Sequence, residues 1–164
     1  MSFKILDLTS GYRAIWHNKK HPLATYLDIR PEVNPDFVVN TSNITPEVGT
    51  DFDLIVYDPP HMNCGPNSNL SKRYGYFKTH EIKESIHYTN FEAHRVTKKN
   101  ALMALKWNNH DIKLETVFSI LTKWEPLFGH LTKNGPRSQT YWTMLLRKDY
   151  FSMGYVVAWK ALKV

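Results

Sequence analysis

The sequence predicts an α/β domain built on a mostly parallel sheet, and three observations lead to this fold class. Segments with strand-like apolar residues alternate along the chain with segments that have helical spacing or turn residues. Such alternation favours parallel strands joined by right-handed crossovers. In addition, Asp7, Asp28 and Asp58 each end a predicted strand, and the carboxyl ends of parallel strands border one crevice. The 164 residues suffice for one domain with a sizeable core.

The elements are predicted in order from the period of their apolar residues. The sequence predicts strands at 3–7, 24–28, 36–40, 52–58, 100–107, 126–131 and 140–146. Helical segments are predicted at 13–17, 81–96 and 112–121. The segment 81–96 carries the clearest helical pattern, because Ile82, Ile86, Ala93 and Val96 recur on one face.

Composition and charge restrict the possible environments and partners. The formal net charge is +6, and the stretches 62–80 and 126–148 contain basic residues and no acid. Such blocks suit a polyanion partner, although they also occur on ordinary solvated surface. No apolar stretch is long enough for a membrane span, and a single cysteine, Cys64, cannot form an internal disulfide. With no leader segment at the N-terminus, we expect a cytoplasmic protein that holds no metal, since the eight histidines are scattered.

The sequence Asp58-Pro59-Pro60-His61 follows the buried strand 52–57 and supplies a set of groups suited to a planar nitrogen base. Asp58 and the Pro59 carbonyl can accept hydrogen bonds from an exocyclic amino group, and neither proline has an N–H to compete. The His61 ring can lie against the face of the base. These four residues are the candidate catalytic residues.

A glycine turn after the first strand predicts a ligand site near the backbone. Asp7 is followed by Gly11, and Asp28 lies twenty-one residues after Asp7, as in folds whose acid binds ribose hydroxyls. The phosphate-binding pattern of three glycines is absent, which argues against NAD or FAD and favours S-adenosylmethionine (SAM). Each acid alone is equally compatible with a strand-end turn. The candidate cofactor residues are Asp7, Thr9, Ser10, Gly11, Asp28, Ile29, Asn40 and Asn43.

Residues 62–80 are a candidate substrate loop or lid, because structureless segments of this length are uncommon except in binding loops. Lys72, Arg73 and Tyr74 mix charge with an aromatic ring there, as nucleic-acid surfaces do. Further candidate nucleic-acid contacts lie outside this loop: Lys106, Trp107 and Arg137. Trp107 fits a wall of the base pocket and fits the protein core equally well.

With these features the chain resembles class I SAM-dependent methyltransferases that carry an Asp-Pro-Pro-aromatic signature, and more narrowly small phage and viral proteins of that kind. The resemblance is carried by residues 5–11 with Trp16, 27–30, 52–61, 106–108 and 126–130. It implies a Rossmann-like fold whose mostly parallel sheet has an antiparallel C-terminal strand. It also implies one minimal domain, 1–164, with a C-terminal extension at 149–164, working in the host cytoplasm.

The implied activity is methylation of an exocyclic amino group, with adenine N6 in DNA favoured over cytosine N4. In this mechanism a flipped base is held by Asp58 and the Pro59 carbonyl while His61 stacks on it. Two alternatives stay open: an RNA methyltransferase, and a viral factor that binds SAM or nucleic acid without turnover. No insertion large enough for a separate recognition domain is present, so a homodimer on a palindromic site is a further expectation.

Overall fold

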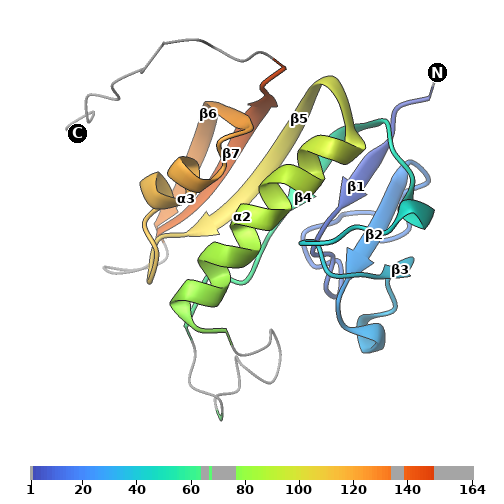
Figure 1. Ribbon diagram of the computed structural model, residues 1–164. Helices are drawn as coiled ribbons and strands as arrows, with labels where there is room; N and C mark the ends of the chain where they lie inside the picture. Colours follow the sequence, from blue (N-terminus) through green and yellow to red (C-terminus); the bar gives the residue numbers. More distant parts are fainter. Residues whose placement is uncertain (1, 64–66, 68–76, 134–138, 150–164) are drawn as a thin grey trace.

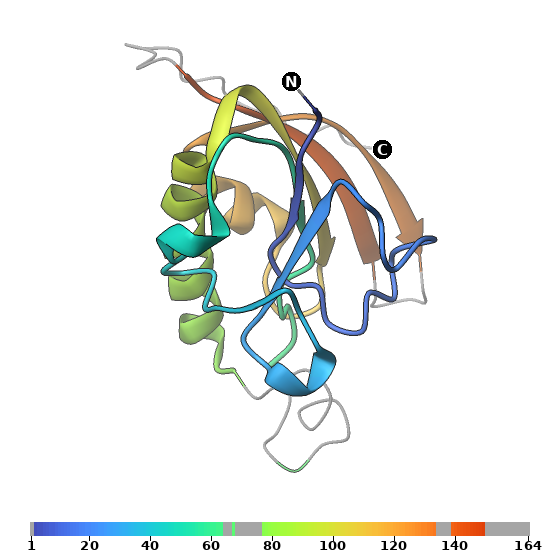
Figure 2. The ribbon, with the colours of Figure 1, turned by 90° about the vertical axis from the view of Figure 1, so that its right-hand side faces the viewer.

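A computed structural model describes residues 2–63, 67, 77–133 and 139–149, which form a seven-stranded sheet with helices on one face (Figures 1 and 2). The strands are β1 (Ile5–Asp7), β2 (Ala24–Asp28), β3 (Phe37–Val38), β4 (Phe52–Tyr57), β5 (Thr97–Asn108), β6 (Trp124–Lys133) and β7 (Gln139–Arg147). The helices are α2 (Thr79–Val96) and α3 (Leu114–Ile120), with short 3₁₀ turns η1 (Pro31–Val33) and η2 (Pro46–Val48). No helix among these residues is long and apolar enough to cross a membrane.

The strand order is β3-β2-β1-β4-β5-β7-β6. The first five strands in this order pair in parallel, and β7 runs antiparallel between β5 and β6. This arrangement confirms the predicted α/β class, including the mostly parallel sheet and the antiparallel strand near its C-terminus. The carboxyl ends of β1, β2 and β4 therefore meet at one edge, where parallel-sheet proteins bind ligands.

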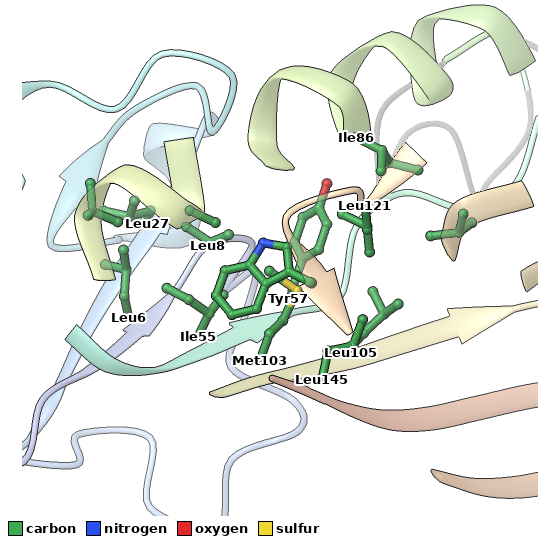
Figure 3. Close-up of a cluster of buried hydrophobic side chains, with 14 of the residues drawn as sticks. Leu6, Leu8, Leu27, Ile55, Tyr57, Ile86, Met103, Leu105, Leu121 and Leu145 are labelled. Carbon is green, nitrogen blue, oxygen red and sulfur yellow. The ribbon is translucent and has the colours of Figure 1, made fainter. Parts of the chain in front are cut away.

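One face of the sheet packs against α2 and α3 and forms the core. Paired residues in adjacent strands share a face, and Leu6, Ile55, Met103 and Leu145 form one such row across β1, β4, β5 and β7. All four are fully or almost fully buried. Figure 3 shows this cluster together with Ile86 from α2, which reaches it from the helix side. The packing of α2 on this face of the sheet explains why buried residues alternate along β5 and why they recur at helical spacing in α2.

The other face carries no described helix, and both helices lie on the same side of the sheet in Figure 2. Over β1 and β2 this face is covered by the segment before β2. There Arg13 lies 3.9 Å from the centre of the Tyr26 ring, and Trp16 packs edge-on against it. Over β4, β5, β7 and β6 the same face presents two apolar rows and one polar row. We call this part the open face; it comprises Leu54, Leu102, Leu146, Val56, Ala104, Met144, Phe128, Lys106, Trp142 and His130, and the exposed Glu125 of β6 ends the row of Leu54, Leu102 and Leu146.

The predicted helical segment at 13–17 is wrong, because the structure forms successive turns there. Arg13 has a positive φ of 56°, and its N–H donates to the Ser10 carbonyl oxygen at 2.7 Å. The Arg13 and Trp16 side chains are both used in contacts with β1 and β2. Tertiary contacts have therefore overridden a weak local helix signal. The other predicted elements are present, with ends shifted by a few residues.

Candidate active site

A cavity of about 820 Å³ lies at the carboxyl ends of the parallel strands. Its walls come from the turn after β1, the ends of β2 and β3, the residues after β4, and one side of α2. The lining comprises residues 8–12, 14–15, 28–30, 39–42, 57–62, 77, 81–82, 84–86, 88 and 106. This volume lies in the range of sites that enclose a nucleoside-sized ligand.

Asp7 sits behind the turn that forms one wall, and it does not line the cavity. The carboxylate is fully buried, accepting a hydrogen bond from Trp16 Nε1 at 2.7 Å and one from the Thr9 N–H at 3.1 Å. Burial raises the pKa of Asp7 to about 7, against the lowering effect of these two donors. The prediction that Asp7 faces the cationic end of a cofactor is therefore corrected. Asp7 is buried behind the turn after β1 and accepts hydrogen bonds from Thr9 and Trp16.

Asp28 does line the cavity, but its carboxylate is already saturated. Oδ1 accepts from the Arg30 N–H at 3.0 Å and from Arg30 Nε at 2.9 Å, while Oδ2 accepts from the Gly11 N–H at 2.8 Å and Arg30 Nη2 at 3.1 Å. Burial acts to raise the pKa of Asp28, yet the bonds from Arg30 and Gly11 outweigh it and the pKa lies below its usual value. A ribose hydroxyl can reach these oxygens after Arg30 moves aside.

Two buried hydroxyls in the cavity wall lack a hydrogen-bond partner among the described residues: Ser10 Oγ and the Tyr57 phenol. The Thr89 hydroxyl lies close enough to Tyr57 to counter part of the burial effect on its pKa, but it makes no hydrogen bond of normal geometry to the phenol and is paired with Thr41 Oγ1 at 2.9 Å. Burial raises the pKa of Tyr57, which keeps its O–H as a donor. Buried polar groups usually have partners, so two unsatisfied hydroxyls in one cavity indicate a polar ligand.

The remaining predicted cofactor residues divide between the cavity and the surface. Thr9, Gly11, Ile29 and Asn40 line the cavity, and Ile29 offers an apolar side chain that is 56% exposed. Asn43 is exposed and lies outside the cavity, so the structure does not bring it to the other candidates.

Asp58 stands at the rim of the cavity and is joined to both neighbouring strands. Its N–H donates to Thr9 Oγ1 at 2.9 Å, which fixes the Asp-Pro-Pro segment to the turn after β1. Its Oδ2 accepts from Lys106 Nζ at 2.6 Å. Both side chains keep about a quarter or less of their surface exposed. Lys106 lies at this crevice edge as predicted, and its partner is the Asp58 carboxylate; its contact with nucleic acid stays a prediction.

His61 turns back onto the proline pair. Its Nδ1 lies 3.1 Å from the Pro59 carbonyl oxygen, and its ring meets the Trp107 ring at a centroid distance of 5.9 Å and an angle of 65°. Burial lowers the pKa of His61, partly offset by the charge of Asp58. The neutral ring is therefore favoured near pH 7. Pro59 O retains a second lone pair, so it can accept another hydrogen bond.

Trp107 does not reach nucleic acid. It is fully buried on the helix side of β5, and its Nε1 donates to the Ile112 carbonyl oxygen at 2.8 Å. Of the two interpretations of Trp107, the protein core is confirmed and the wall of the base pocket is corrected, since its ring contacts His61 from the core side. Lys72, Arg73, Tyr74 and Arg137 lie outside the described residues, as do most of the 62–80 loop and the extension from residue 150.

Sequence reasoning missed three contributors to this site. Arg30 donates to the Asp28 carboxylate, and the Asp-x-Arg spacing was the sequence feature that could have predicted this pair. Trp16 donates to Asp7 from a turn with no periodic pattern; the family resemblance includes Trp16, but no spacing predicted this hydrogen bond. Tyr57 was assigned only to the strand, and its position directly before Asp58 was the available clue. Among the described residues, no group of three or more His, Cys, Asp or Glu side chains is placed to hold a metal ion.

Comparisons with known proteins identify the fold. The sequence matches no family model and no curated protein sequence. It is similar in structure to the N-methyltransferase NodS from Bradyrhizobium japonicum WM9 in complex with S-adenosyl-L-homocysteine, with a TM-score of 0.60, 13% identity, and coverage of 88% of this chain and 78% of that one. The chain has the methyltransferase fold.

Two further solved structures show the same likeness. A TehB-like SAM-dependent methyltransferase from Corynebacterium glutamicum aligns with a TM-score of 0.59 at 16% identity, covering 89% of this chain and 80% of that chain. The 16S rRNA (adenine(1408)-N(1))-methyltransferase from Catenulisporales acidiphilia aligns at 0.53 with 13% identity, covering 90% and 86%. At these identities the likeness concerns the fold, and the chemistry must be argued from the residues of the cavity.

Proposed function

We propose that this chain is a SAM-dependent methyltransferase that acts on an exocyclic amino group of a nucleic-acid base. The proposal rests on one observation: the Asp58 carboxylate accepts a hydrogen bond from Lys106 Nζ at 2.6 Å on the rim of the cavity. A carboxylate placed there can hold an amino nitrogen in the same way. The methyltransferase fold of the chain supports SAM as the second ligand.

The residues of the cavity fit SAM by their chemistry. Gly11 adopts a positive φ of 49°, so its turn brings backbone close to a ligand without a side chain in the way. Ser10 Oγ and the Tyr57 phenol offer hydrogen bonds that the protein leaves unused among the described residues. Ile29 supplies an apolar surface for the adenine ring, and Asp28 supplies carboxylate oxygens once Arg30 moves aside.

The chain's own groups then position the amine. The Asp58 Oδ1 atom has no hydrogen bond to the described residues, because Lys106 is bonded to Oδ2. Oδ1 and the Pro59 carbonyl oxygen together can accept the two amino hydrogens, which directs the nitrogen lone pair toward the cavity. Asp58 also offers a site for the proton released by the amine. When bound, SAM supplies a methyl group on a sulfonium sulfur that leaves as a neutral thioether.

Positioning is the main contribution that we expect from the protein. Because the leaving group is already good, alignment of the two reactants can supply roughly 7 kcal/mol or more of the barrier reduction. The neutral His61 ring covers the base, and Trp107 supports that ring from the core side. Lys106 neutralises Asp58, so an uncharged base enters a site with little net charge.

Adenine N6 in DNA is the first substrate to test, as the Asp-Pro-Pro-His sequence suggests. RNA is the second candidate, and the specific observation in its favour is the fold likeness to the rRNA methyltransferase and to an rRNA methylase from Streptococcus thermophilus. Both substrates would present an unpaired base to the same groups.

The test combines the protein with methyl-labelled SAM and separate pools of DNA, RNA and small amines. Nucleosides are then released and identified by mass spectrometry. We expect label in N6-methyl-2′-deoxyadenosine from the DNA pool or in N6-methyladenosine from the RNA pool. Label confined to small amines, or tight SAM binding with no transfer to any pool, would overturn the proposal and favour, respectively, a small-molecule enzyme or a binding factor.

A further inference from the structure

The ion pair between Lys106 and Asp58 engages only one of the two carboxylate oxygens. Lys106 Nζ donates to Asp58 Oδ2 at 2.6 Å, and no hydrogen bond joins Oδ1 to a described residue. A second lysine–aspartate pair joins β4 and β5 at their other ends, and its geometry differs. There Lys98 Nζ donates to both oxygens of Asp53, at 2.9 Å and 3.1 Å. The pair at the cavity therefore leaves one carboxylate oxygen for a ligand, whereas the distant pair engages both.

The Lys106 ammonium also has donors that the protein leaves unused. A lysine ammonium carries three N–H donors. Among the described residues, Lys106 Nζ makes one hydrogen bond, to Asp58, and it lies 5.9 Å from the centre of the Trp142 ring. Lys106 lines the cavity, and its side chain keeps 26% of its surface exposed. Two N–H groups next to the Asp58 carboxylate are therefore available to a ligand in the cavity.

The His61 ring lies close to both members of the pair. Burial is the main cause that lowers the pKa of His61, while the charge of Asp58 acts against it and the charge of Lys106 adds to it. All three residues line the cavity. A base covered by the His61 ring would therefore have one edge facing Asp58 and Lys106.

The chemistry of the bases decides which edge this pair can bind. In adenine and cytosine, the carbon that bears the amino group is bonded to a ring nitrogen with a free lone pair, N1 of adenine or N3 of cytosine. Asp58 Oδ1 can accept a hydrogen bond from the amino group, but Oδ2 would then face this lone pair and repel it. Lys106 is already bonded to Oδ2, so a further N–H of its ammonium can stand between the two acceptors.

We propose that Lys106 donates a hydrogen bond to the ring nitrogen beside the target amino group, so that Asp58 and Lys106 together bind a donor–acceptor edge. This inference rests on the proposed function and defines its substrate class: adenine, through N6 and N1, or cytosine, through N4 and N3. Lys106 is then a specificity-determining residue in addition to the counterion of Asp58.

The same pair excludes bases that present the reverse order of groups. Thymine and uracil present a carbonyl oxygen beside a ring N–H, and guanine does so at O6 and N1. In the site, the carbonyl oxygen would face the Asp58 carboxylate and the ring N–H would face the Lys106 ammonium. Both contacts join like groups, and each leaves a desolvated polar group without a partner.

Replacing one atom of the substrate tests the proposed contact, using the full chain. The strand that accepts label from SAM is synthesised again with 1-deazaadenine at the target, which replaces N1 by C–H and keeps the amino group; 3-deazacytosine serves for a cytosine target. We call the ratio of kcat/KM for the natural base to that for its deaza analogue the preference. The preference should be roughly 10- to 150-fold larger in the wild type than in Lys106→Met, which has no N–H donor at this position.

Comparison of the two proteins separates recognition from the effect of charge. The altered ring also changes the reactivity of the amine, but this change is common to both proteins and cancels, as in a double-mutant cycle. Each preference is a ratio within one preparation, so it does not depend on the fraction of folded protein. If Lys106 only neutralised Asp58, Lys106→Met would slow both substrates equally. An equal preference in the two proteins would therefore overturn the inference.

Two controls define the contact further. Lys98→Met removes the lysine of the other pair, outside the cavity, and should keep the wild-type preference within about twofold. 7-Deazaadenine alters the opposite edge of the base, so its use should not depend on Lys106. A preference lost equally in Lys98→Met, or a dependence on Lys106 for 7-deazaadenine alone, would also overturn the inference.

Failure of the proposed function gives a different result from failure of this inference. If the proposed function is wrong, the wild type transfers no label to the unmodified strand, and the inference fails with it. If only the inference is wrong, the unmodified strand is labelled and the wild type and Lys106→Met have the same preference.

Discussion

Lys106 Nζ donates to Asp58 Oδ2 at 2.6 Å, across the contact between β4 and β5. The partners are forty-eight residues apart in the chain, and they meet because the two strands end side by side at the carboxyl edge of the sheet. The contact places an amine nitrogen against the carboxylate that we assign to the substrate. No hydrogen bond joins Asp58 Oδ1 to another described residue, so Oδ1 can accept one from a ligand.

Asp58→Asn should lower the rate of methyl transfer about 10²- to 10³-fold while leaving SAM binding within a few-fold. The amide keeps the size of the side chain but replaces one acceptor by a donor, and loss of a single positioned group of this kind costs about 10²–10³ in turnover. Single-turnover assays and titration calorimetry with SAM measure the two effects separately.

Asp53→Asn provides the control for that variant. Asp53 also lies in β4 and also pairs with a lysine of β5, Lys98, at 2.9 Å, but it stands at the opposite end of the strand, outside the cavity. It should lose little activity. Comparable turnover in the two variants would remove Asp58 from the reaction.

The pH profile of the activity should fall on the acid side because His61 becomes protonated there. Burial lowers the pKa of His61, so the ring stays neutral at pH 7 and becomes charged as the pH falls below the ordinary histidine range. A protonated His61 ring is less favourable under an uncharged base, because the charged ring must lose its hydration when the base covers it. The pH profile of kcat/KM should therefore fall on the acid side.

His61→Phe should remove this limb, because phenylalanine keeps the ring and does not titrate. His110→Phe, at an exposed histidine beside Asp111, should leave the limb in place. An acid limb that persists in His61→Phe and disappears in His110→Phe would refute the assignment.

Asp7 should make the protein less stable as the pH rises from about 4 to about 7. Burial raises its folded pKa to about 7 from 3.8, so between these values the folded state binds a proton that the unfolded state has released. Stability falls with pH wherever the folded state binds more protons. A shift of about three units corresponds to roughly 4 kcal/mol.

Asp7→Asn removes this titration. The difference in unfolding free energy between wild type and Asp7→Asn, measured by urea denaturation at several pH values, should therefore decrease from pH 4 to pH 7. A difference that does not change with pH would contradict the burial argument.

Gly11→Ala should weaken SAM binding several-fold and lower the Tm by a few degrees. Its φ of +49° costs an alanine about 1–2 kcal/mol, and its N–H is the donor to Asp28 Oδ2. Space is not the obstacle, because a Cβ would meet Arg30 Nη2 at an ordinary 3.5 Å. Calorimetry with SAM and thermal unfolding provide the two measurements.

Gly49→Ala is the control for backbone strain. Gly49 also has a positive φ, +82°, with nothing within 4 Å of a Cβ, and it does not line the cavity. Its ψ of −169° places it in a region that is nearly restricted to glycine, so Gly49→Ala should lose at least as much stability as Gly11→Ala and still bind SAM normally. SAM affinity that falls equally in both variants would indicate a global effect.

Most of the fold was predictable because its signals are local. The strand Ala24–Asp28 was predicted at its observed limits, and the helix containing Ile82 and Val96 was predicted within two residues, since both depend on the period of apolar residues. The burial of Trp107 was also readable, since Met103, Leu105 and Trp107 alternate along one face of a strand. This period favours the core over the base pocket, the two places that residue type alone left open for Trp107.

The detailed site was not predictable in the same way. The contacts of Asp58 with Lys106 and of Asp7 with Trp16 depend on strand order and on a turn without a repeating pattern. The saturation of Asp28 by Arg30 depends on a side-chain conformation rather than on spacing. The residue types therefore allowed these positions to be predicted as site residues. Their hydrogen-bond partners could be identified only from the three-dimensional structure.

The most direct test of the central claim is a crystal structure of the protein with S-adenosylhomocysteine. We predict that the ligand lies in the cavity, with its amino-acid end at the Ser10–Gly11 turn, its ribose at Asp28 and its sulfur facing Asp58. Ligand density outside this cavity, or an Asp58 side chain directed away from the sulfur, would contradict the account.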